Sequence, residues 1–185
     1  MSIAIIIIVV IAICIVIMYN DLVRTRNRVN NAWSQVDVQL QRRFDLIPNL
    51  VDSVKGYMNH EESTLSKIAE LRTTWANTTS IQEKAKLEGE LSTALKSIMA
   101  VSENYPELKA NQNFLQLQEE LKNTESKIAY ARQFYNDVVT KFNTKLEVFP
   151  TNMIGRLFKF ELSELFQVES EEVRNNVKVD FSSKE

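Results

Sequence analysis

Glycine, proline and cysteine are scarce in this chain of 185 residues, which has three glycines, three prolines and one cysteine. A fold of many short strands needs many tight turns, and glycine and proline supply most of them. Their scarcity argues against an all-β fold and favours a few long helices. The single cysteine, Cys14, has no second thiol in the chain with which to form a disulfide. We therefore expect an all-α protein.

Charge of one sign is not gathered anywhere into a block. The 22 Lys and Arg residues are interspersed with 24 Asp and Glu residues along the chain. Proteins that bind nucleic acid contact its phosphates through clustered Lys and Arg. Nucleic acid is therefore not an expected partner.

Residues that build catalytic or metal sites are equally scarce. His60 is the only histidine, whereas zinc sites need several converging ligands and catalytic triads need an oriented base. The glycines lie too far apart for a phosphate-binding loop. Adjacent acidic pairs such as Glu119-Glu120 are expected on solvated helix faces. We expect no enzymatic activity, no cofactor, no metal site and no small-molecule substrate.

One long apolar run lies at the N-terminus. Every residue from Ile3 to Met18 is apolar, and Tyr19 follows at the boundary. A helix over this run and the next few residues spans roughly 30 Å, which is the thickness of the hydrocarbon core of a bilayer. A cleaved signal peptide would need Lys or Arg before the run, and none is present. Residues 1–23 are therefore predicted to form an uncleaved transmembrane anchor.

Three arginines set the expected orientation of this anchor. Arg24, Arg26 and Arg28 follow the apolar run, and no basic residue precedes it. Basic residues that flank a membrane span remain on the cytoplasmic side. We expect a single-pass protein of the bacterial inner membrane, with the N-terminus outside, the C-terminal domain in the cytoplasm and the lipid bilayer as a partner.

Residues 24–149 show the apolar spacing of packed helices, in which three- and four-residue steps alternate. The first apolar stripe runs from Val29 to Met58 and passes through Pro48, where we expect a kink rather than an end. Asn59 is predicted to cap a second, shorter helix that ends near Trp75.

Two further helices are predicted in the same region. Ser80 opens a capping box for the third helix, which Pro106 closes or bends. The last long helix is expected to start near Asn113, and its apolar repeat is regular enough for coiled-coil-like packing. Such helices need neighbours to bury their apolar stripes, so the region is predicted to be a helical bundle.

Specific residues carry a resemblance to a known family. They are Tyr19-Asn20, Ala32-Trp33, Arg42-Arg43, Asp45-Leu46-Ile47-Pro48-Asn49-Leu50-Val51, Tyr105-Pro106, Thr124-Glu125, Tyr135-Asn136 and Phe149-Pro150. In this pattern the chain closely resembles the LemA family of bacterial membrane proteins. The resemblance implies a single anchor, an up-and-down antiparallel four-helix bundle and an association with the cell envelope. A magnetosome-membrane protein is similar to this family, which raises a membrane-shaping role by analogy.

Charged residues fall on or beside the apolar stripes of the bundle. Arg43 lies next to the first stripe, between Arg42 and Asp45. Buried charges of this kind usually form ion pairs that set helix register, although a polar functional site is the alternative. We expect the two arginines to meet Glu125 on the last long helix, with Arg132 seven residues further along the same face.

The C-terminal segment, residues 150–185, differs in composition from the bundle. Its apolar residues lie on one side of a possible short amphipathic helix, which either packs on the end of the bundle or contacts lipid or a neighbouring subunit. Residues 177–181 alternate apolar and polar side chains, as extended segments do. The candidate contact residues are Met153, Ile154, Leu157, Phe158, Leu162 and Phe166.

Together these features predict a non-enzymatic, membrane-anchored structural or interaction protein of the bacterial cell envelope. We expect it to act in membrane organisation or remodelling through self-assembly. Membrane confinement raises the effective concentration of copies, which favours homo-oligomers, and an unidentified membrane protein is a further candidate partner. The alternative is a membrane-tethered signalling transducer or an adaptor for another envelope protein.

Overall fold

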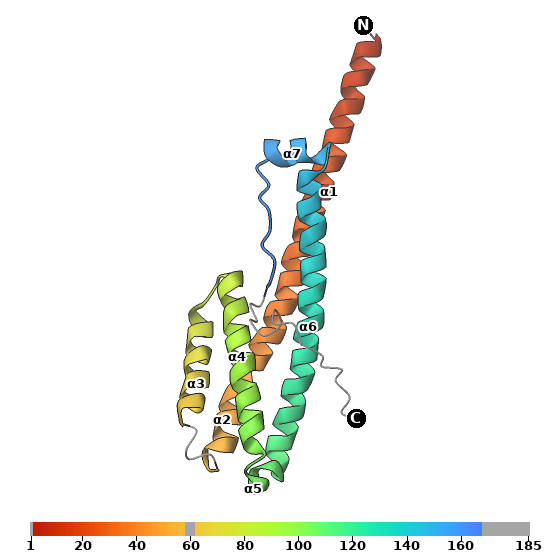
Figure 1. The fold of residues 1–185 in the computed structure, drawn as a ribbon. Coiled ribbons are helices and arrows are strands. Elements are labelled where there is room, and N and C mark those ends of the chain that lie inside the picture. Colours follow the sequence, from red (N-terminus) through yellow and green to blue (C-terminus); the bar gives the residue numbers. More distant parts are fainter. Residues whose placement is uncertain (1, 58–61, 168–185) are drawn as a thin grey trace, which may run out of the picture.

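The computed structural model describes residues 2–57 and 62–167, and every regular element in these ranges is a helix (Figure 1). The predicted all-α class is confirmed. His60, the expected cap at Asn59 and the alternating residues 177–181 lie outside the described residues. The helices are α1 (Ser2–Asp45), α2 (Ile47–Lys55), α3 (Glu62–Asn77), α4 (Ile81–Ser102), α5 (Pro106–Lys109), α6 (Gln112–Glu147) and α7 (Thr151–Leu157).

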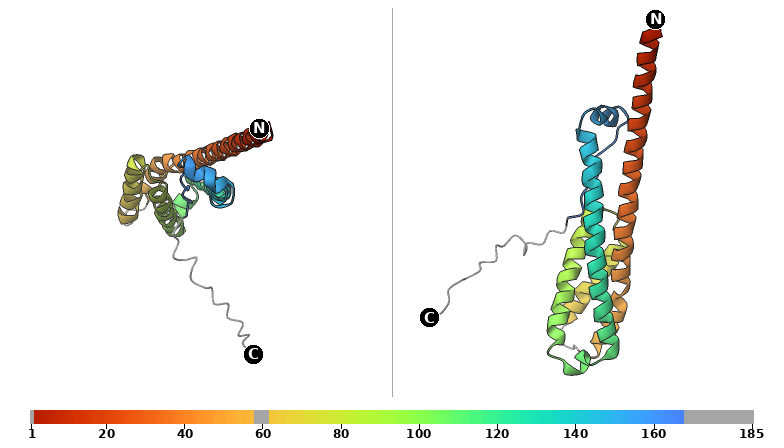
Figure 2. Two further views of the ribbon diagram at one scale, coloured as in Figure 1. Left: turned by 90° about the horizontal axis from the view of Figure 1, so that it is seen from above. Right: turned by 90° about the vertical axis from the view of Figure 1, so that its right-hand side faces the viewer.

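The two longest helices, α1 and α6, lie side by side and antiparallel over much of their length (Figures 1 and 2). Helix α2 continues α1, and the chain then returns along α3, descends along α4 and climbs again along α6 (Figure 1). The α3–α4 hairpin covers only the half of the α1–α6 pair that is distant from the N-terminus. The first part of α1 projects beyond all other elements.

Helix α1 has two parts with opposite surroundings. Its first part, from Ile3 to Ile17, is apolar and exposed, and it is the described segment that is long and apolar enough to cross a membrane. From Leu22 onward the helix buries one side, at spacings of three and four residues, against the rest of the chain. One continuous helix therefore carries both the apolar segment and a core-forming face. The finding is consistent with membrane anchoring.

The helix is interrupted at Leu46, two residues before Pro48. The backbone N–H of Leu46 donates to Arg43 O, and that of Leu50 donates to Leu46 O. Proline lacks the N–H that would continue the ladder, which explains a break at this place. The apolar stripe resumes in α2 with Ile47, so the expected continuation beyond Pro48 is confirmed.

Two predicted helix starts are also confirmed. Ser80 Oγ accepts a hydrogen bond from the N–H of Glu83 and caps α4. Asn111 Oδ1 accepts from the N–H groups of Asn113 and Phe114 and caps α6, two residues from the predicted start. Each side chain satisfies backbone donors that have no partner within the helix.

The C-terminal segment differs from the predicted amphipathic helix. Helix α7 ends at Leu157, and residues 158–167 continue without regular secondary structure. Lys159 has φ of 54°, a left-handed conformation that turns the chain out of the helix. The prediction that residues up to Phe166 share one helix face is therefore wrong, because the chain reaches Phe166 along an extended path.

We call the half of the molecule that is distant from the N-terminus, where the α3–α4 hairpin packs, the distal half. In its core Phe44 stacks on Trp75 with ring centroids 4.3 Å apart. Phe44 is 1% exposed. Replacing Phe44 with Ala is expected to lower the free energy of unfolding by about 3–5 kcal/mol, because it leaves a cavity between α1 and α3. The measurement is urea unfolding of the full chain in detergent, followed by circular dichroism.

Phe134→Ala is the matched control, since Phe134 is 51% exposed on α6. It should change stability by less than about 0.5 kcal/mol. Equal losses for the two variants would contradict the assignment of Phe44 to the core.

Candidate functional site

An ion pair lies in the interior between α1 and α4. Arg43 Nη1 donates to Glu88 Oε1 at 2.5 Å and to Ser92 Oγ at 2.9 Å, and Ser92 Oγ donates to the same carboxylate oxygen at 3.1 Å. The side chains of Arg43 and Glu88 are 3% and 7% exposed. A buried charge without a partner would cost several kcal/mol, so this pair requires α1 and α4 to meet in one register.

The predicted network of Arg42, Arg43, Asp45, Glu125 and Arg132 is not formed. Of these five residues only Arg43 is buried; Arg132 is half-buried and the other three are exposed. Arg43 pairs with Glu88 instead of Glu125, and no ion pair within residues 2–57 and 62–167 includes Arg42 or Glu125. Asp45 accepts a hydrogen bond from Gln41 one turn earlier. The prediction was wrong because α4, not α6, presents an acid to Arg43.

The burial of Glu88 could have been predicted from the sequence, but it was not. It lies on a regular apolar stripe of α4 with Leu91, Leu95 and Ile98, at spacings of three and four residues. A charged residue in such a position must be buried with the stripe. The same rule had singled out Arg43, so matching the two interrupted stripes would have suggested the pair.

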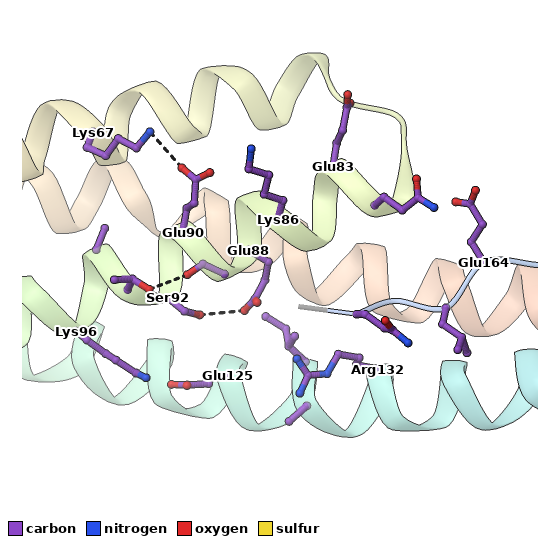
Figure 3. A pocket seen from close by; sticks show the side chains of 18 of the residues that line it. Lys67, Glu83, Lys86, Glu88, Glu90, Ser92, Lys96, Glu125, Arg132 and Glu164 are labelled. Atoms are coloured by element: carbon purple, nitrogen blue, oxygen red, sulfur yellow. Dashed lines mark hydrogen bonds and ion pairs between the residues drawn. The ribbon is translucent and has the colours of Figure 1, made fainter. Parts of the chain in front are cut away.

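An open groove of about 1620 Å³, lined by both polar and apolar side chains, is bordered by α3, α4 and α6 and extends to residues 162–167 (Figure 3). Within the described ranges, no group of His, Cys, Asp and Glu residues is arranged to hold a metal ion. The groove offers charged groups of both signs in contact with solvent, and Glu90 raises the pKa of Lys67 by a hydrogen bond and by its charge. The labelled charged residues that line it are Lys67, Glu83, Lys86, Glu88, Glu90, Lys96, Glu125, Arg132 and Glu164.

Residues 158–167, which we call the strap, are held on α6 by two asparagines. Asn143 donates from Nδ2 to Ser163 O at 2.9 Å and accepts from the N–H of Ser163 at 2.9 Å. Asn136, seven residues earlier, donates to Phe166 O at 3.1 Å and accepts from the N–H of Phe166 at 2.9 Å. Each amide satisfies both backbone groups of one residue, so the strap needs no strand beside it.

Aromatic side chains pack both ends of the strap against α1 and α6. Phe166 is 1% exposed, and its ring centroid lies 5.8 Å from that of Trp33. Near the other end, Phe160 lies 6.4 Å from Phe142, and the guanidinium carbon of Arg26 lies 5.1 Å from its ring centroid. The strap therefore covers the half of the α1–α6 pair that the α3–α4 hairpin leaves uncovered.

Tyr135 adds a hydrogen bond from its hydroxyl to Glu164 O at 2.7 Å. Burial, together with the charge of Glu164, raises the pKa of Tyr135 to about 12. The neutral phenol is thus the form that the folded chain holds. The sequence pattern placed Tyr135 on the apolar stripe of the last long helix and marked Asn136 as a family position, but it did not predict the strap.

The end of α6 nearest the apolar segment meets α1 through both polar and aromatic contacts. Lys145 Nζ donates to Asp21 Oδ2 at 2.6 Å and to Thr25 Oγ1 at 3.0 Å. Tyr19, which follows the apolar run, contacts Phe158 with ring centroids 4.6 Å apart. These contacts place α7 beside the last residues of the apolar segment.

The residues predicted for the anchor and its interface all lie on α1. Ile3 is 76% exposed and Met18 and Tyr19 are half-buried. Arg24, Arg26 and Arg28 are exposed.

The six residues predicted for a lipid or subunit contact separate into two groups. Ile154 and Phe166 are 6% and 1% exposed and pack within the molecule. Met153, Leu157, Phe158 and Leu162 are 61%, 68%, 47% and 58% exposed. Packing within the molecule therefore accounts for two of the six residues, and the other four remain available for a contact with lipid or another protein.

Comparison with known proteins shows the family to which the chain is similar. The profile of the LemA family matches residues 32–181. The chain is 30% identical to Protein LemA of Metamycoplasma hominis over 165 residues, which cover 84% of this chain and 75% of that protein. It is 23% identical to the magnetosome proteins MamQ 1 and MamQ 2 of Paramagnetospirillum magneticum, over 80% of this chain and 64% of each relative. None of these names states an enzymatic activity.

The Arg43–Glu88 pair generates a prediction for stability. Arg43→Met leaves Glu88 buried without a cation and is expected to cost about 3–5 kcal/mol of unfolding free energy. The double variant Arg43→Met/Glu88→Leu should recover most of this loss, because no buried charge remains. Urea unfolding of the four proteins of the double-mutant cycle, including Glu88→Leu, measures the coupling between the two residues.

Lys67→Met provides the control, since it breaks the exposed pair that Lys67 forms with Glu90 at 3.1 Å. It should cost less than about 1 kcal/mol. An Arg43→Met loss no greater than this would contradict the buried pair.

Tyr135 generates a prediction for pH dependence. Tyrosine in the unfolded chain titrates near 10 and folded Tyr135 near 12, so the unfolded state loses its proton first and stability falls as pH rises from 10 to 12. Tyr135→Phe removes a hydrogen bond worth about 1 kcal/mol at neutral pH. The difference in unfolding free energy between the unmodified chain and Tyr135→Phe should therefore decrease from pH 10 to pH 12, as measured by urea unfolding.

Tyr130→Phe is the control, since Tyr130 is 75% exposed, and the same difference for this variant should not change with pH. A difference for Tyr135→Phe that stays constant from pH 10 to pH 12 would refute the buried hydroxyl assigned to Tyr135.

Proposed function

Because the chain belongs to the LemA family, which the match over residues 32–181 shows, we propose that it is a non-enzymatic, membrane-anchored structural protein of the bacterial cell envelope. Its apolar segment crosses the inner membrane once, and α1–α2, α3, α4 and α6 act as an up-and-down antiparallel four-helix bundle in the cytoplasm. The protein works by holding this bundle at the membrane and by assembling with further copies or with an envelope partner.

The continuity of α1 is the observation that carries this proposal. The helix runs without interruption from Ser2 to Asp45, and its first break, at Leu46, lies deep in the bundle. A flexible tether would need a stretch rich in Gly or Ser between the span and the bundle, and none separates Ile17 from Leu22. The membrane segment and the bundle are therefore one stiff body, suited to positioning rather than to free reach.

The flanking charges support the orientation. Arg24, Arg26 and Arg28 are exposed on α1 directly after the apolar segment. They favour a cytoplasmic bundle, because basic flanks resist transfer across the membrane.

Two considerations support self-assembly and a role in membrane organisation. Confinement to a bilayer raises the effective concentration of copies, so weak lateral contacts suffice. Two of the relatives are named as magnetosome proteins, which supports the role in membrane organisation by analogy.

Fusions to the C-terminus test anchoring, orientation and assembly in bacterial cells. A green fluorescent protein fusion should be fluorescent and resist extraction from membranes by alkaline carbonate, whereas an alkaline phosphatase fusion should be inactive, because the C-terminus is cytoplasmic. Stepwise photobleaching of single fluorescent particles should show more than one copy.

A fusion that lacks residues 3–18 is the matched control and should leave the membrane fraction. Phosphatase activity in the intact fusion would overturn the orientation. Carbonate-extractable protein would overturn the anchor, and single bleaching steps alone would overturn self-assembly.

A further inference from the structure

We propose that α7, with Val148 and Phe149 before it, is a second membrane contact that lies in the headgroup layer of the bilayer crossed by α1. We call residues 148–158 the collar. This inference rests on the proposed anchoring and adds a lipid-binding surface that fixes the height and tilt of the bundle.

The position of the collar is the first argument. Tyr19 directly follows the apolar run, and its ring lies 4.6 Å from Phe158 at the end of α7. Figures 1 and 2 show α7 lying across α1 rather than along it. When α1 crosses a bilayer, Tyr19 lies at the interface where tyrosine is favoured. The collar then lies along the membrane surface at the same depth.

The chemistry of its two faces is the second argument. Ile154 and Gly155 are buried and face the rest of the molecule. Met153 and Leu157 lie one turn apart on α7 and are 61% and 68% exposed, and Phe149, which precedes the helix, is 78% exposed. Large apolar side chains on one side of an amphipathic helix are a surface for the boundary between headgroups and acyl chains. Burial in lipid removes this apolar area from water.

Positive charge accompanies the apolar side chains. Arg156 and Lys159 are exposed in and just after α7, and Arg24 is exposed on the neighbouring part of α1. Basic side chains at this depth meet the anionic headgroups of a bacterial membrane. Continuity with the apolar segment therefore favours lipid over a protein as the occupant of this face.

The collar is seated closely enough to transmit this contact to the bundle. A Cβ atom added at Gly155 would lie 2.8 Å from Leu146 Cδ2 on α6, so α7 lies close against α6 here and a larger side chain would have to displace Leu146 or α7. Thr151 Oγ1 also donates a hydrogen bond to Lys145 O on α6. Two contacts with one bilayer, through α1 and through α7, restrict the tilt of the molecule, which α1 alone would not.

Depth-dependent fluorescence quenching of the full chain tests the collar. In a Cys14→Ala background, single cysteines replace Met153 or Leu157 and carry an environment-sensitive nitrobenzoxadiazole label. The protein is reconstituted in vesicles of phosphatidylethanolamine and phosphatidylglycerol, with or without lipids that carry a nitroxide near the top of the acyl chain. Both labels should show blue-shifted emission and strong quenching by the nitroxide lipid.

Two further positions calibrate the result. Val9, 50% exposed in the apolar segment, reports insertion of the anchor, and Leu115, 46% exposed at the far end of α6, reports water. Adding Gly155→Leu to the Met153 variant should reduce quenching, because the larger side chain displaces α7 from its seat.

Each outcome decides a separate point. Quenching at 9, 153 and 157 but not at 115 supports the collar. Quenching at 9 alone overturns the collar and leaves the anchor intact, whereas no quenching at any position overturns both. Blue-shifted but unquenched emission at 153 and 157 would mean that protein covers the face, which also overturns the lipid contact.

Discussion

The antiparallel pairing of α1 with α6 is the interaction on which the rest of the structure depends. Both helices bury one side at three- and four-residue spacing, and every other described element contacts one or both of them: α3 through Trp75, α4 through Glu88, and α2, α5 and α7 by direct packing. Two such helices cannot enclose their apolar stripes by themselves, because each leaves the flanks of the seam open to water. The pair therefore requires a third layer along its whole length.

That third layer is built in two different ways. Next to the break at Leu46 it is the α3–α4 hairpin, which is helical and satisfies its own backbone. Nearer the apolar segment it is the strap, an extended chain whose backbone is satisfied at Ser163 and Phe166 by the side chains of Asn143 and Asn136. The asparagines thus allow a thin element to cover the part of α1 that lies closest to the apolar segment.

The buried Arg43–Glu88 pair gives the distal half its specificity. Apolar stripes tolerate sliding by a turn at modest cost, whereas a buried ion pair tolerates almost none because either charge alone would be desolvated. Lys84, which pairs with Asp37 and lies 4.8 Å from the ring centroid of Trp75, adds a second α1–α4 link, one turn before Glu88 on α4. The seams between α1 and α4 are therefore fixed by charge, and the α1–α6 seam mainly by apolar packing.

Local physical chemistry allowed the helices, the cap at Ser80 and the apolar N-terminal helix to be predicted from the sequence alone. An apolar run such as Ile3–Met18, a capping Ser80 and the stripe from Phe114 to Phe142 each act within one element, so spacing and residue type suffice. The partner of Arg43 and the path of residues 158–167 depended on the tertiary structure. Several acids of similar character could have faced Arg43, and only the packing of α4 against α1 selected Glu88. The strap has no periodicity of its own, because its hydrogen-bond partners are side chains on α6, more than fifteen residues away in the chain.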